Sequence, residues 1–361
     1  MISISKPLIS EEEQVAVRSV LSSGFLAQGP KVKEFEEAFA KYVGVKHAVA
    51  TSSGTSALHL ALLACGVKRD DEVITTPFSF IASSNSILYC NAKPVFVDIG
   101  DDFNIDADKI VEKISPKTKA ILPVHLYGNP CNMDKLQEIA FENNVVLVED
   151  ACQAHGAEVN GKKTGSFGKA GCFSFYPSKN MTCSEGGMVT TDDEKVMLNC
   201  RALRHHGSLK PYAYDVLGFN YRMTDVSAAI GLEQLKKLDE FNSRRIENAA
   251  FYNECFKGVE GLETPGVERG KKHVFHQYTL RIAKSAAVSR DELAKHLLKR
   301  GVKSGVYYPL PIHKQPLYKD FDVSVPNAQK ACKEVLSLPI HPLLSKGERE
   351  VVVDAVNEVV S

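Results

Sequence analysis

The strongest constraint on the fold is an alternation of short apolar runs with helical patterns between residues 48 and 191. Seven runs, each bounded by turn-forming residues, have the length of buried strands. They are Ala48–Ala50, Val73–Thr76, Val95–Asp98, Ala120–His125, Val145–Asp150, Cys172–Tyr176 and Met188–Thr191. Helical patterns lie between several of them, at Ser56–Cys65, Ser83–Tyr89 and Met133–Asn143. This alternation predicts an α/β domain with a mainly parallel seven-stranded sheet that helices cover on both faces.

A different pattern begins at Asp225, where residues 225–252 form one long helical stretch. Beyond it come a strand-like run at 276–283, a charged helix at Arg290–Arg300 and a last helix at Ser345–Val360. Two amphipathic helices at residues 10–22 and 32–42 precede the first strand. We therefore predict a large domain over residues 1–245, with an N-terminal arm, and a smaller α+β domain over residues 246–361.

Charge and cysteine content exclude several classes of protein. The 361 residues hold 44 Lys and Arg against 44 Asp and Glu, which disfavours binding to nucleic acid or anionic membranes through net charge. No apolar run is long enough to span a bilayer, and the N-terminus lacks the pattern of a signal peptide. The nine cysteines are scattered without metal-ligand spacing. We expect a cytoplasmic protein with reduced thiols and no metal site.

Lys179 is the residue with the clearest chemical potential. It follows the apolar, aromatic run Phe173–Tyr176 and lies where a predicted strand gives way to a loop. α/β proteins place their reactive groups at such positions. An uncharged lysine amine there can bond to an aldehyde, provided that the protein binds the aldehyde and keeps the amine unprotonated.

Other segments supply complementary groups. The turn Ser52–Ser56 begins a helix, where free N–H groups favour an anion such as phosphate, although the same pattern is ordinary helix capping. Asp150 closes a buried strand and needs a cation or a capped helix as partner. Ser174, inside the strand before Lys179, needs a hydrogen-bond partner. Together these groups match the phosphate, ring nitrogen and aldehyde of pyridoxal 5′-phosphate (PLP).

The chain resembles the DegT/DnrJ/EryC1/StrS sugar aminotransferases, which are PLP enzymes of fold type I. The resemblance covers nearly the whole length, and its stretches, in order, are GFLAQGPKVKEFEEAFAKYVG, ATSSGTSALHLAL, TPFSFIASSNSI, PVFVDI, PVHLYGNPCNMD, VEDACQAHGA, FSFYPSKN, EGGMVTT, RALRHHG, GFNYRMTD and YYPLPIHKQPLY. One departure is Met181–Ser184, where many relatives have a glycine-containing turn.

The resemblance implies a role for each matching residue. Lys179 holds the cofactor and then moves a proton, and Asp150 pairs with the protonated ring nitrogen. The ring is contacted by Phe80 and Gln153. Its phosphate is held by Gly54, Thr55, Ser56 and Ser174. The sugar site is bordered by Tyr308 and His313. Asn220 reaches the phosphate in a neighbouring subunit, which implies a homodimer with active sites at the interface.

The resemblance also implies the reaction, in which an amino acid, by family habit L-glutamate, gives its amino group to a nucleotide-linked keto-sugar. A sugar dehydratase is a rival, but relatives of that kind have histidine where this chain has Lys179. Another fold-type I enzyme acting on a non-sugar amine is a second rival. A non-catalytic regulator is a third, and the intact Asp150 and Lys179 disfavour it.

Overall fold

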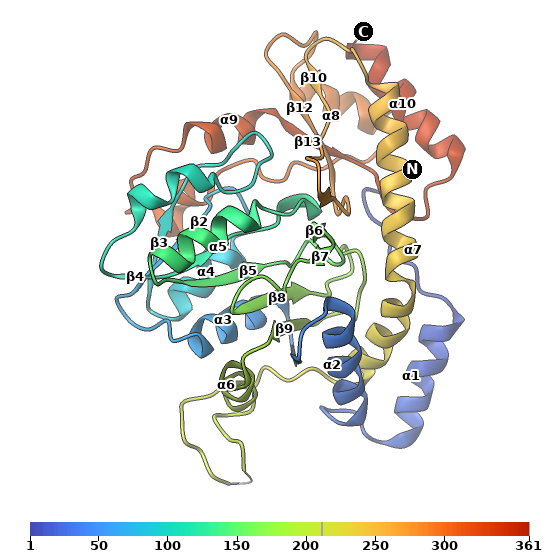
Figure 1. The fold of residues 1–361 in the computed structure, drawn as a ribbon. Helices are drawn as coiled ribbons and strands as arrows, with labels where there is room; N and C mark the ends of the chain where they lie inside the picture. Colours follow the sequence, from blue (N-terminus) through green and yellow to red (C-terminus); the bar gives the residue numbers. More distant parts are fainter. Residues whose placement is uncertain (211, 361) are drawn as a thin grey trace.

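A seven-stranded sheet forms the centre of the protein in the computed structural model, which describes residues 1–210 and 212–360 (Figure 1). Its order is β1-β9-β8-β5-β4-β2-β3, with β5, β4, β2 and β3 parallel to β8. β9 runs antiparallel to both of its neighbours. The strands are β1 (His47–Thr51), β2 (Glu72–Thr75), β3 (Lys93–Phe96), β4 (Thr118–Leu122), β5 (Val146–Asp150), β8 (Ala170–Ser174) and β9 (Gly187–Thr191). The prediction of a mainly parallel seven-stranded sheet is confirmed.

Alternate residues of each strand point to opposite faces of the sheet, and each face packs against its own helices. Cys172 and Val189 belong to a core with α3 (Gly54–Ala64) and α6 (Glu194–Arg204). Phe173 and Met188, one residue along each strand, belong to a core with α2 (Pro30–Val43) and α7 (Asp225–Cys255). Near the sheet lie also α4 (Ala82–Tyr89) and α5 (Met133–Glu142), with the 3₁₀ turns η1 (Ala107–Lys109), η2 (Val111–Lys113) and η3 (Leu126–Gly128), whereas α1 (Glu11–Ser23) packs on α7.

A second core lies beyond α7, around the three-stranded antiparallel sheet β10-β12-β13. Its elements are β10 (Leu262–Glu263), β12 (Tyr278–Ile282), β13 (Val335–Leu338), α8 (Arg290–Lys299) and α10 (Lys346–Val360). Ile2 packs in the same core and pairs with Val302, so the N-terminal arm returns to this part of the molecule. The boundary at residue 245 stays a prediction, and the last residue of the predicted small domain lies outside the described residues.

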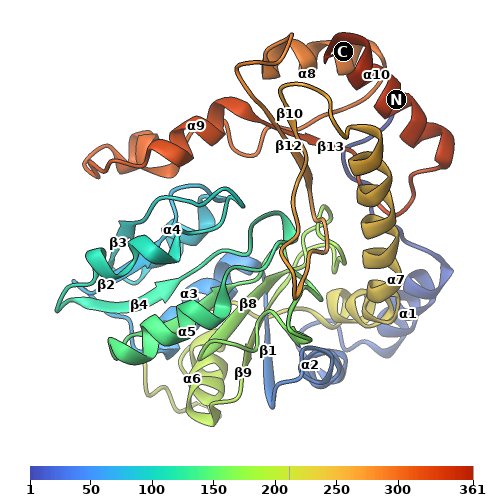
Figure 2. The same ribbon diagram turned by 45° about the horizontal axis from the view of Figure 1, so that its top comes forward.

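The segment between α8 and β13 reaches back over one end of the large sheet. It contains η4 (Ile312–Lys314), η5 (Pro316–Tyr318) and α9 (Pro326–Glu334), and α9 lies above the β3 and α4 side of the sheet (Figure 2). Asp98, just after β3, accepts hydrogen bonds from the backbone N–H groups of Asn327 and Ala328 at the start of α9. These hydrogen bonds anchor the start of α9 beside the end of β3.

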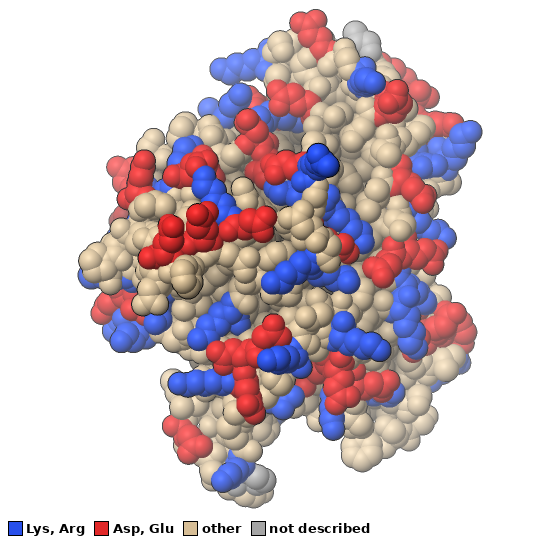
Figure 3. Space-filling model, viewed as in Figure 1, with Lys and Arg blue, Asp and Glu red and all other residues tan. Residues whose placement is uncertain are grey.

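Some elements differ from the prediction. The sequence patterns did not predict α6, α9 or β13, nor the small sheet of β6 (Glu158–Val159), β7 (Lys162–Lys163) and β11 (Lys271–Lys272). Acidic and basic side chains are interspersed over the face in Figure 3, in keeping with the balanced composition. Among the described helices, none combines the length and the apolar character needed to cross a membrane.

Candidate active site

A cavity of about 430 Å³ lies at the carboxyl ends of the parallel strands. Its wall includes eight of the eleven residues expected at the site, namely Gly54, Thr55, Phe80, Asp150, Gln153, Ser174, Lys179 and Tyr308. These residues come from segments far apart in the chain, which the ends of β1, β2, β5 and β8 bring to one edge of the sheet. Ligands of open α/β sheets bind at such an edge.

Asp150 occupies the floor of the cavity, where its carboxylate is buried. Ser83 Oγ donates a hydrogen bond of 2.7 Å to Oδ2, and the Cys152 backbone N–H donates one of 3.2 Å to Oδ1. The ion pairs among the described residues do not include Asp150. A buried carboxylate without a cationic partner fits a ligand that brings a positive charge, such as a protonated ring nitrogen.

The start of α3 and the end of β8 approach each other closely at one end of the cavity. A Cβ on Gly54 would lie 2.6 Å from Ser174 Cβ, so only glycine fits. The N–H groups of Gly54 and Thr55 belong to the first turn of α3 and have no partner within the helix. They line the cavity with Ser174, which makes this end suited to a phosphate.

Ser56, unlike Gly54, Thr55 and Ser174, does not face the cavity. Its Oγ accepts a hydrogen bond of 2.9 Å from Ser53 N and contacts Ser53 O at 2.8 Å, which completes a capping box with Ser53. Ser56 is buried and is absent from the residues that line the cavity. Its hydroxyl therefore shapes the turn that presents Gly54 and Thr55.

Lys179 lies on the cavity wall, just after β8, and is partly accessible there. Burial of the amine among protein atoms lowers its pKa, and the nearby Cys152 and Asp150 only partly oppose that effect. The lysine takes part in none of the ion pairs among the described residues. A lysine with these properties is suited to bond with an aldehyde.

The departure at Met181–Ser184 produces an ordinary buried turn. Cys183 N and Thr182 Oγ1 donate hydrogen bonds of 3.0 and 2.9 Å to Phe175 O, and Met181 and Cys183 are buried. Ser184 adopts the left-handed conformation, with φ of 70°, which glycine adopts at lower cost. The chain thus forms a tight turn after Lys179 without glycine.

Gln153 links the floor of the cavity to its roof. Gln153 Oε1 accepts a hydrogen bond of 2.8 Å from Tyr127 N, which leaves the amide nitrogen to donate to Tyr308 Oη at 3.4 Å. Phe80 lies across from Tyr308, with 6.4 Å between ring centroids, and 57% of Phe80 is exposed. Both rings line the cavity, and the exposed face of Phe80 is available to a flat ligand.

Two further expected residues lie outside this cavity. His313, in η4, is buried against Phe96, and its Nε2 lies 3.4 Å from Gln329 Nε2. Asn220 is exposed on the segment before α7, where it pairs with His205. His155, close to Gln153 in the sequence, is buried between Phe173 and Phe175, and burial lowers its pKa to about 3.

Several lining residues were not predicted from the sequence, namely Ser83, Glu185, His276, Gln277 and Tyr307. Ser83 could have been found, because it lies in the first turn of the helix that follows β2, close to the strand ends where α/β proteins place their sites. The others come from distant loops and carry no local signal.

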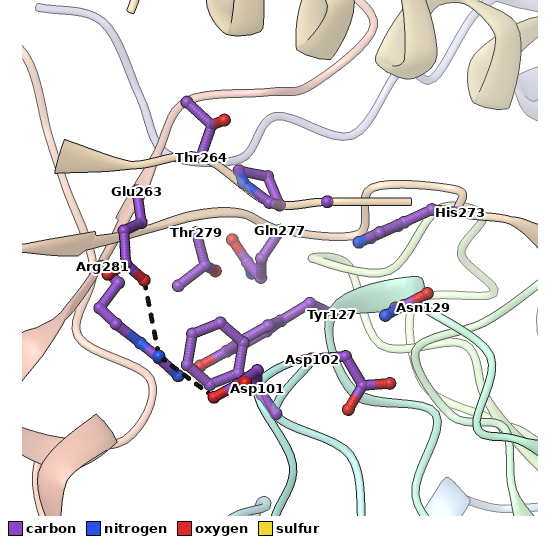
Figure 4. A pocket seen from close by; sticks show the side chains of 13 residues that line it. Asp101, Asp102, Tyr127, Asn129, Glu263, Thr264, His273, Gln277, Thr279 and Arg281 are labelled. Carbon is purple, nitrogen blue, oxygen red and sulfur yellow. Dashed lines mark ion pairs between the residues drawn. The ribbon is translucent and has the colours of Figure 1, made fainter. Parts of the chain in front are cut away.

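A second pocket of about 60 Å³ shares Tyr127 and Gln277 with the cavity, and Arg281 crosses it towards Asp101 and Glu263 (Figure 4).

The sequence matches the DegT/DnrJ/EryC1/StrS aminotransferase family over residues 7–357. The chain belongs to this family. The family's members are PLP enzymes, so PLP is the cofactor that the cavity must accept. A buried carboxylate outside any ion pair, a cradle of free N–H groups at Gly54 and Thr55, and a lysine of lowered pKa provide for its three functional groups.

Relatives of this aminotransferase carry different names. GDP-perosamine synthase of Caulobacter vibrioides is 40% identical, over 99% of this chain and 98% of its own. A pleiotropic regulatory protein of Geobacillus stearothermophilus is 41% identical, over 94% and 92%. The solved structure of Helicobacter pylori PseC, an aminotransferase involved in the biosynthesis of pseudoaminic acid, has a TM-score of 0.95 and 31% identity, and covers 99% of each chain.

Proposed function

We propose that this protein moves an amino group from an amino acid, L-glutamate by expectation, to a nucleotide-linked keto-sugar. The observation that carries the proposal is one cavity in which Lys179, free of ion pairs, shares the wall with the buried carboxylate of Asp150. Relatives named as nucleotide-sugar enzymes support the substrate class.

The residues of the cavity then have distinct tasks. Bound PLP supplies an aldehyde that accepts amino groups and a ring that withdraws electrons. Lys179 holds the cofactor at rest and, once free, takes the proton from the reacting substrate carbon. Asp150 keeps the proton on the ring nitrogen, and Ser83 and the Cys152 N–H fix its carboxylate.

The other lining residues bind and orient. The N–H groups of Gly54 and Thr55, together with Ser174, hold the phosphate, while Ser56 shapes their turn. Phe80 covers one face of the ring, and Gln153 donates from its amide nitrogen on the ring's hydroxyl side. Tyr308 borders the space for the sugar, and His313 supports that segment from behind.

We also propose that the active unit is a homodimer. The segment before α7 carries several large apolar side chains in solvent, namely Leu209, Tyr212, Tyr214, Val216 and Leu217. Exposed apolar groups on one segment are typical of an interface. Asn220, next to them, would reach the cofactor phosphate of a second copy.

All nine cysteines are free thiols, which supports an origin in the reducing cytoplasm.

The reverse reaction tests the function and identifies the sugar. The purified holoenzyme is incubated with 2-oxoglutarate and, one at a time, nucleotide-linked amino-sugars that carry the amine at C3 or C4 on UDP, dTDP or GDP. Glutamate released with at least one of them supports the proposal. If no sugar yields glutamate while a non-sugar amine does, the protein is another kind of PLP enzyme. No reaction with any amine would favour a regulator.

A further inference from the structure

His276 lines the cavity with Lys179, although it comes from the loop before β12. Its ring is buried, with 5% of the residue exposed, and Nδ1 has no hydrogen-bond partner among the described residues. Burial, with Lys179 and Arg245 nearby, holds the pKa of His276 well below its usual value, so the ring is neutral and carries one N–H. A missing partner also occurs at His155, so it is the place of His276 on the cavity wall that allows its ring to hydrogen-bond to a ligand.

Arg245 of α7 lies directly behind this histidine. Its Nη1 donates hydrogen bonds of 3.2 Å to Phe275 O and 3.3 Å to His276 O. The guanidinium is buried, its Nε has no partner, and the described residues give it no carboxylate within ion-pair distance. Burial lowers the pKa of Arg245 to about 10, so it stays charged at neutral pH.

An uncompensated buried cation is costly, and a nearby anion reduces that cost. The residues that line the cavity include no arginine, and the proposed function assigns Lys179 to the cofactor. The only described guanidinium bonded to the wall of the cavity is therefore Arg245, which acts through the His276 backbone. The His276 side of the cavity thus combines a free imidazole with a positive potential.

We infer that this side binds the carboxylate of the amino-acid donor, an inference that rests on the proposed function. His276 donates its ring N–H to the carboxylate, and Arg245 is a positioning residue that holds the His276 backbone and supplies the positive charge. The chemistry of an amino acid fits this place, because its carboxylate is one bond from the carbon whose proton Lys179 takes. The phosphates of a nucleotide-sugar are attached several bonds from the reacting carbon.

Separate measurement of the two half-reactions tests this assignment in the holoenzyme. One arm follows the change in cofactor absorbance with L-glutamate, and the other follows it with the nucleotide keto-sugar after amination. His276→Phe keeps a ring of similar shape without the N–H, and His276→Asn withdraws the donor from the cavity. His296→Phe is the matched control, because His296 lies on α8 and pairs with Glu358 away from the cavity.

We expect both His276 variants to raise the half-saturating glutamate concentration about tenfold or more, as loss of a hydrogen bond to a charged group does. The keto-sugar half-reaction and the cofactor absorbance should change little, and His296→Phe should match the wild type. Equal effects on both half-reactions, an effect on the sugar alone, or wild-type behaviour of both variants would overturn the assignment. A wild-type enzyme that accepts no amino group from any amino acid would instead refute the proposed function.

Discussion

Ser83 Oγ donates a hydrogen bond of 2.7 Å to Asp150 Oδ2, although the two residues lie on different elements, α4 and β5. Ser79 donates in turn to Ser83 at 3.3 Å, so the carboxylate stands at the end of a short chain of hydroxyl groups. This contact fixes the direction in which Asp150 presents its charge to the cavity. It also gives a test of Asp150 that leaves its carboxylate in place.

Ser83→Ala should weaken the binding of PLP about tenfold, because a hydrogen bond to a buried charged group is lost. The dissociation constant is measured by titrating the apoenzyme with PLP and following absorbance. Ser86→Ala is the matched control, since Ser86 is a buried serine on the same helix whose hydroxyl donates to Ser83 O. Equal affinities for both variants would contradict a role for Ser83 in orienting Asp150.

Gly54→Ala should impair the phosphate end of the cavity. The added Cβ would lie 2.6 Å from Ser174 Cβ and 3.0 Å from Cys152 Sγ, so α3 and β8 must move apart. Overpacking of this kind costs about 1–3 kcal/mol, and we expect a lower Tm and weaker binding of PLP. Gly347→Ala, in α10 with open space around its Cβ, should keep or raise the Tm. Normal PLP affinity in Gly54→Ala would argue against the cradle.

The buried carboxylate of Glu13 should make the protein sensitive to acid. Burial raises the pKa of Glu13, but hydrogen bonds from Lys237, Ser10 and Gln234 outweigh that effect and lower the pKa to about 2. Because the folded pKa lies below the unfolded one of 4.5, the stabilisation is complete above about pH 5 and is lost as the pH falls towards 2.

Glu13→Gln should therefore reduce the stability at pH 7 by on the order of 2 kcal/mol, and the difference in Tm from the wild type should shrink as the pH falls from about 5 to about 2. Glu11→Gln, an exposed change in the first turn of the same helix, serves as control. A Tm difference that stays constant over this range would contradict the assigned pKa.

The sequence was sufficient to predict the seven strands of the large sheet, because buried strands between helices leave short apolar runs. It did not predict that β9 runs antiparallel, since apolar runs carry no direction. The second domain was harder to predict, because β13 directly follows α9 and its apolar run, Val335–Leu338, has no turn signal before it. Long-range pairing with β12 defines that strand.

The residues of the site likewise fall into those that the sequence predicted and those that it did not. Asp150 was found because it ends an apolar run and Lys179 because it follows one, and their convergence follows from parallel strands. Ser56 fits the alternative reading of its turn, helix capping, because its hydroxyl bonds to Ser53. His276 could not be found, since nothing near it in the chain distinguishes a cavity histidine from a packed one such as His155.

The most direct test of the account concerns Lys179. The Lys179→Ala holoenzyme is compared with the wild type for the visible absorbance of bound PLP, before and after L-glutamate is added, and for 2-oxoglutarate released with a keto-sugar acceptor. We predict that the variant folds, lacks the absorbance that depends on the lysine–aldehyde bond, and releases no 2-oxoglutarate. A Lys179→Ala protein that transfers the amino group at the wild-type rate would contradict the central claim.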